Sequence, residues 1–94
     1  MAEIDIKTET DGPNRWSYEV SVFDHGRHHE FNVTLSWADY DLWCHGRAQP
    51  QKVVQAVFEF LLQREPVTSI LSRFDCSVVR RYFPEVDKKL PAMI

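Results

Sequence analysis

Two segments in which apolar and polar residues alternate, joined by a short polar link, constrain the fold of this chain most. The segments are RWSYEVSVF and EFNVTLSW, and the link begins DHG. Their apolar positions are Trp16, Tyr18, Val20, Val22, Phe31, Val33, Leu35 and Trp37. A period of two places one face of a strand against a core and the other in water. Since Asp24, His25 and Gly26 suit a tight turn, the sequence predicts a β-hairpin over this region.

An earlier segment, EIDIKTE, alternates in the same way and predicts a first strand. Ile4, Ile6 and Thr8 share one side of it, and the turn residues TDGPN follow. The three strands would form an antiparallel meander with one face in water. The polar residues expected on that wet face are Ser17, Glu19, Ser21, His28, Glu30, Asn32 and Thr34. The strand over residues 28–36 is either central or an edge, and an edge would offer a route to a dimer.

The most apolar part of the chain, PQKVVQAVFEFLLQRE, predicts a long helix from Pro50 to Glu65. Proline suits the first turn of a helix, where its missing N–H is not needed. The polar residues form one narrow stripe, made of Lys52, Gln55, Glu59 and Gln63. A helix this apolar must be covered on most sides, so we expect the sheet on one side and the tail of the chain on another.

Shorter helices are predicted on either side of the long one. In SWADYDLWCHG, Ser36 caps a helix and Gly46 ends it, although the preceding strand continuing to Tyr40 is an alternative. TSILSRF predicts a short helix from Thr68, and Asp75 caps a second one in CSVVRRYF. The last residues, EVDKKLPAMI, add at most one turn and a loose end.

Together these elements predict an α+β fold. A three-stranded antiparallel β-meander packs on one face against a long helix, and short C-terminal helices close over that helix. Residues 1–94 form a single domain, with the sheet over about 3–37 and the helical part over about 38–90.

Composition restricts the classes of function. The amino terminus does not resemble a secretory signal, and the longest apolar run, about ten residues, is roughly half of what spans a bilayer. Two cysteines, Cys44 and Cys76, are too few for a disulfide framework. We therefore expect a cytoplasmic protein with no membrane partner. The net charge of −3 argues against non-specific nucleic-acid binding, although residues 51–94 alone are mildly basic.

One segment carries a resemblance. FEFLLQREPVTSILSRFDCSVVRRYFPE, residues 58–85, resembles the carboxy-terminal segment of a group of short bacterial proteins of unknown function. This resemblance implies no activity. The hairpin followed by a helix is also similar in architecture to antitoxins of the HicB type.

Three of the four histidines lie in DHGRHHEF, which raises the possibility of a divalent-metal site. His28 and Glu30 share one face of the predicted strand, whereas the adjacent His29 points the other way. His25 in the turn is a third candidate ligand, and His45 or Cys44 would have to supply a fourth. The simpler interpretation is a polar turn, because no recognised ligand spacing is present.

The basic end of the chain raises the alternative of a DNA-binding or antitoxin-like regulator. Residues 68–83 have the outline of a helix-turn-helix. Its candidate nucleic-acid contacts are Arg73, Ser77, Arg80 and Arg81, with Lys88 and Lys89 as further phosphate contacts. The opposing interpretation is an ordinary solvated helix face that balances the acidic half of the chain.

Trp37, Tyr40 and Trp43 form an aromatic group on the predicted short helix. Such a group is either core or, if exposed, an anchor for a protein partner. We find no catalytic constellation and no cofactor motif in the sequence. The sequence therefore favours a non-catalytic protein-binding or regulatory module that binds a protein partner or, as a homodimer, itself.

Overall fold

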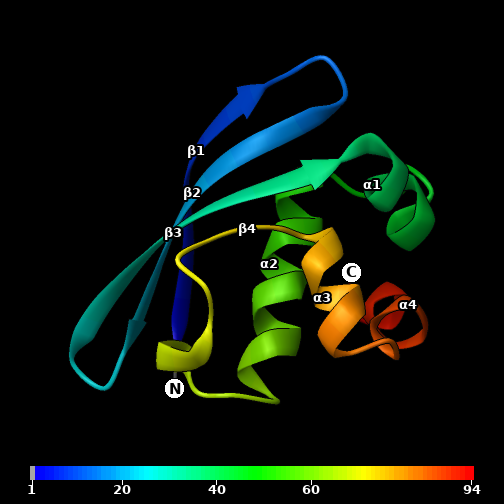
Figure 1. Cartoon of the computed structure of the whole chain (residues 1–94). Helices are drawn as coiled ribbons and strands as arrows, with labels where there is room; N and C mark the ends of the chain where they lie inside the picture. Colours follow the sequence, from blue (N-terminus) through cyan, green and yellow to red (C-terminus); the bar gives the residue numbers. More distant parts are fainter. Residues whose placement is uncertain (1) are drawn as a thin grey trace.

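A computed structural model describes residues 2–94 and shows an α+β fold. Four strands, β1 (Glu3–Asp11), β2 (Arg15–Asp24), β3 (Arg27–Ser36) and β4 (Arg73–Asp75), form one sheet in the order β1-β2-β3-β4. The helices are α1 (Trp37–Cys44), α2 (Pro50–Leu62), α3 (Ser77–Tyr82) and α4 (Val86–Lys89), with 3-10 turns η1 (Val67–Ser69) and η2 (Leu90–Met93). Figure 1 shows α2 alongside the meander, with α3 and α4 beyond it.

The predicted hairpin is confirmed. β2 and β3 pair antiparallel along their whole length, from Arg15 opposite Ser36 to Asp24 opposite Arg27. The turn is only two residues long, and both have positive φ, 52° at His25 and 77° at Gly26. Two such residues twist the backbone in the sense that paired strands need, which makes this the favoured hairpin turn.

β1 pairs antiparallel with β2 but contains a β-bulge that the sequence did not reveal. The register shifts between Ile6, opposite Val20, and Thr8, opposite Glu19. The extra residue, Lys7, moves everything after it to the other face. The prediction that Thr8 shares a side with Ile6 is therefore wrong: Thr8 lies beside Glu19 on the open face of the sheet.

The fourth strand replaces a predicted helix. The chain from Thr68 forms only the turn η1, and β4 then pairs in parallel with residues Asn32–Thr34 of β3. The N–H of Asn32 donates to the carbonyl of Ser72 (2.8 Å), and the N–H of Cys76 donates to the carbonyl of Thr34 (2.8 Å). β3 therefore has a paired strand on both of its edges over residues 32–34. The predicted short helix from Thr68 is wrong, and so is the prediction that residues 38–90 contain helices alone.

The core lies between the sheet and α2, as predicted. Val20, Val33 and Val57 are at most 1% exposed and belong to one hydrophobic cluster. At its centre, the Phe58 ring lies 5.2 Å from the Phe31 ring and 5.9 Å from the Phe74 ring. The helix ends at Leu62, three residues before the predicted end at Glu65. Its predicted polar stripe, Lys52, Gln55, Glu59 and Gln63, is exposed.

The tail covers the other side of α2, and it is not a loose end. Val86 and Leu90 are fully buried in the same core, and the Phe83 ring meets the Phe60 ring edge to face at 6.0 Å.

The polar residues predicted on the open face of the sheet are exposed, with two exceptions. Ser21 is buried and Thr34 is half-buried. Within residues 2–94, no helix combines the length and apolar character needed to cross a bilayer.

Candidate partner-binding site

The helix that carries most of the candidate site, α1, begins and ends as its sequence predicts. The Ser36 hydroxyl accepts a hydrogen bond from the N–H of Asp39 (3.1 Å), which satisfies one of the unpaired donors at the helix start. Two left-handed residues, His45 and Gly46, turn the chain away at the other end. Since β3 stops at Ser36, the alternative that the strand continues to Tyr40 is wrong.

Trp16, Trp37 and Tyr40 form an aromatic surface at the end of the sheet where α1 begins. The ring centroid of Trp16 lies 5.8 Å from that of Trp37, and the Tyr40 ring meets Trp16 edge to face at 5.1 Å. Trp37 is 54% exposed, whereas the other two are half-buried. Trp37 therefore leaves a broad indole surface in water.

Backbone and side-chain contacts fix this aromatic surface in place. The N–H of Trp37 donates to the carbonyl of Asn14 (3.0 Å) in the loop between β1 and β2, which joins α1 to the sheet. The Tyr40 hydroxyl donates to the carbonyl of Ala48 in the link to α2. The Trp37 backbone and the Tyr40 side chain are thus held by two different parts of the chain.

Trp43, the third predicted partner-binding residue, belongs to the interior instead. It is 1% exposed, and its indole N–H donates to the Asp87 carboxylate (2.9 Å) on α4. The prediction of Trp43 as a contact residue is therefore corrected. Trp16 takes its place in the aromatic surface. The only sequence signal for Trp16 was its position as the first apolar residue of β2, at the end of the sheet.

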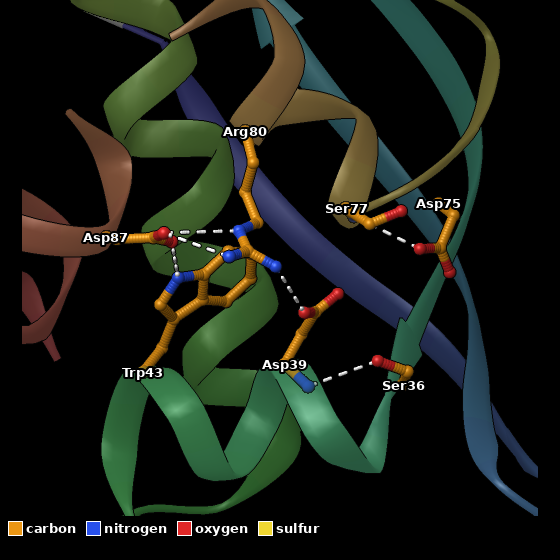
Figure 2. A network of polar contacts seen from close by, with 7 residues as sticks. All are labelled: Ser36, Asp39, Trp43, Asp75, Ser77, Arg80 and Asp87. Carbon is orange, nitrogen blue, oxygen red and sulfur yellow. Dashed lines mark hydrogen bonds and ion pairs between the residues drawn. The ribbon is translucent and has the colours of Figure 1, made fainter. Parts of the chain in front are cut away.

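Arg80 completes a polar network that ties α1 to α3 and α4 (Figure 2). Its guanidinium donates to Asp87 through Nη2 (3.1 Å) and Nε (3.2 Å) and lies 3.5 Å from Asp39 through Nη1. Burial raises the pKa of Asp39 above its ordinary value, although Ser36 and Arg80 oppose this shift. Because a buried carboxylate needs a partner, the network holds α1 firmly against the tail helices.

The same network changes how the candidate nucleic-acid contacts are interpreted. Arg80 faces two carboxylates of its own chain, and the backbone N–H of Ser77 donates to the Asp75 carboxylate (3.1 Å). Arg73 and Arg81 are exposed and make no ion pair with any residue from 2 to 94. The helix-turn-helix outline predicted over 68–83 is wrong, because the end of η1, a non-helical link and β4 take the place of its first helix. Binding to DNA stays a prediction.

The candidate metal ligands do not gather. In the described part of the chain, no group of three or more His, Cys, Asp or Glu side chains is placed to hold an ion. His25 projects into solvent beside Asp24, and His28 packs on the Phe23 ring with centroids 4.8 Å apart. Glu30 instead pairs with Lys7 (3.1 Å). His45 follows α1, at the opposite end of β3 from the turn.

Both cysteines are buried and unpaired, and Cys76 is fully enclosed at the junction of β4 and α3. Although Cys76 directly precedes α3, burial raises the pKa of its thiol well above the usual value. The nearby Asp75 and Asp39 carboxylates act in the same direction.

Cys76 should therefore be unreactive in the folded protein. We expect Ellman's reagent at mildly alkaline pH to modify it at least about 100-fold more slowly than in urea, since a buried thiol reacts only after local opening. Comparison with Cys76→Ala assigns the slow thiol. Rapid modification of Cys76 in the folded protein would contradict the enclosed, protonated thiol.

The segment that resembles short bacterial proteins, residues 58–85, supplies core residues to this arrangement. Phe58, Phe60 and Phe74 are buried, so much of its sequence serves packing. Neither a protein-family model, nor a curated protein, nor a solved structure matches this chain. The resemblance thus stays a prediction.

Proposed function

We propose that this chain is a non-catalytic protein-binding module that binds a protein partner through the aromatic surface of Trp16, Trp37 and Tyr40. The observation that carries the proposal is the 54% exposure of Trp37 on a helix that is otherwise firmly attached. Tryptophan and tyrosine are enriched among the residues that dominate the affinity of protein interfaces. They combine a large apolar area with few rotatable bonds.

Rigid support strengthens this proposal. Binding is weakened by the entropy lost when mobile side chains and loops become ordered. Here the Trp37 backbone is hydrogen-bonded to Asn14, and its ring packs on Trp16 before any partner arrives. The contact of Trp43 with Asp87 and that of Asp39 with Arg80 fix the rest of α1. A partner would therefore meet a surface already in its binding conformation.

We also propose that the module acts in the cytoplasm. The two thiols, Cys44 and Cys76, are both free. Unpaired cysteines of this kind are typical of proteins that work in a reducing compartment.

The test compares Trp37→Ala with Leu42→Ala, which removes a 41% exposed side chain from the same helix. Tagged wild type and both variants are used to capture proteins from an extract of the native host, and captured proteins are quantified by mass spectrometry. We expect one partner to be retained by the wild type and by Leu42→Ala and lost by Trp37→Ala. With that partner purified, Trp37→Ala should weaken the Kd about 30-fold, the effect of losing roughly 2 kcal/mol.

The opposite result is equally clear. If the purified partner binds Trp37→Ala and wild type with the same Kd, the aromatic surface is not its binding site. If the wild type captures no protein above background, the proposed function itself is contradicted.

A further inference from the structure

A second apolar surface lies on elements that the aromatic surface does not use. A groove of about 410 Å³ runs between the end of α2, the segment leading into β4, and α3. Its apolar lining includes Leu61, Ile70, Leu71, Phe74, Val78 and Tyr82. At its mouth, Leu71 is 54% exposed and Tyr82 is 69% exposed. This face therefore has a hollow and two protruding apolar side chains beside it.

A surface that carries both a hollow and a protrusion is suited to pairing with itself. In a two-fold symmetric dimer each surface meets an identical one, so that a protrusion on either copy enters the hollow of the other. We propose that a second copy of this chain covers the groove, with Leu71 and Tyr82 of both copies buried. A dimer of standard size would enclose about 800 Å² of each chain, roughly one seventh of its 5946 Å² surface.

The charges around the groove support the same occupant. Glu65 lines the groove at the α2 side, and Arg81 precedes Tyr82 on α3. Neither forms an ion pair with the residues that the structure describes, whereas nearby Arg64 pairs with Glu85 at 3.3 Å. The groove thus has an acidic residue in its lining on the α2 side and a basic residue next to its lining residue Tyr82 on the α3 side. With the two-fold axis running along the groove, Glu65 of each copy would approach Arg81 of the other, which adds complementary charge at the rim.

The first experiment measures mass by light scattering over a wide range of protein concentration. We expect the wild type to reach about 22 kDa, twice the chain mass of 11.1 kDa. Leu71→Asp should stay at the monomer mass. The matched control is Leu42→Asp, which places the same charge at a similarly exposed leucine of α1 and should still dimerise. A wild type that is monomeric at every concentration, or a Leu71→Asp variant that dimerises as well as the wild type, would overturn the proposal.

A charge exchange provides a second measurement that does not depend on placing a charge in an apolar surface. Glu65→Arg and Arg81→Glu should each weaken dimerisation about tenfold, and the double variant should recover most of that loss. A double variant no better than the worse single variant would overturn the proposed contact. Trp37→Ala should dimerise like the wild type, so the dimer and the partner-binding function succeed or fail separately.

Discussion

Replacing Phe58 by alanine is expected to lower the free energy of unfolding by about 4 kcal/mol, because truncating a fully buried phenylalanine leaves a cavity in the core. Phe58 is fully buried, and its ring lies between Phe31 of the central strand and Phe74 of β4. The substitution therefore weakens the contact between α2 and both strands at once. Such a loss is a large part of the roughly 5–15 kcal/mol that stabilises a domain.

The matched control for this substitution is Phe23→Ala, because Phe23 is 37% exposed near the β2–β3 turn. It should lose no more than about 1 kcal/mol, as expected where a side chain is already partly in water. Urea unfolding followed by circular dichroism gives both values. Equal losses in the two variants would show that Phe58 is not at the centre of the core.

Arg80→Ala should lower the free energy of unfolding by about 2 kcal/mol, while Arg81→Ala should change it by less than about 0.5 kcal/mol. The two arginines are neighbours on α3, but only Arg80 bridges Asp87 and the 8% exposed side chain of Asp39. Removing Arg80 leaves a buried carboxylate without its partner. We place the loss below the full cost for a buried pair because the Arg80 side chain is itself 42% exposed.

A double variant separates this explanation from a simple loss of packing. Asp39→Asn removes the negative charge that Arg80→Ala leaves uncompensated, so the combination should be more stable than Arg80→Ala alone. Unfolding in urea, at a protein concentration low enough to keep every variant monomeric, measures all of them under the same conditions. If Arg80→Ala and Arg81→Ala are equally stable, the network in Figure 2 does not hold α1 in place.

The parts of the fold that were predictable are those set by contacts between close neighbours in sequence. Alternation placed Val20 and Val33 on one face, and the turn at His25 and Gly26 fixed the register between their strands. The start of α2 at Pro50 followed from local chemistry in the same way. These signals depend on a few adjacent residues, which is why the sequence alone predicts these elements.

What could not be predicted depends on residues far apart in the chain. β4 is three residues long, too short for a periodic pattern, and exists because Asn32–Thr34 of β3 offer a free edge. The bulge at Lys7 shows only in the pairing of β1 with β2. Short elements of this kind are decided by tertiary contacts.

The candidate site was predictable only in part for the same reason. Trp37 and Tyr40 were recognised together because they lie on one helix. Trp16 joins them through the geometry of the sheet. Trp43 leaves the group because Asp87, more than forty positions later, offers an acceptor for its indole N–H.

The parallel pairing of β4 has a consequence for the order in which a newly made chain acquires its structure. The hairpin of β2 and β3 is complete by residue 36, but its partner strand is translated only at residues 73–75. Until then, the backbone of Asn32 and Thr34 has no strand to pair with along that edge. From the time the hairpin forms until residues 73–75 join it, the hairpin thus exposes an edge that neighbouring chains can join, and the late arrival of β4 closes that edge.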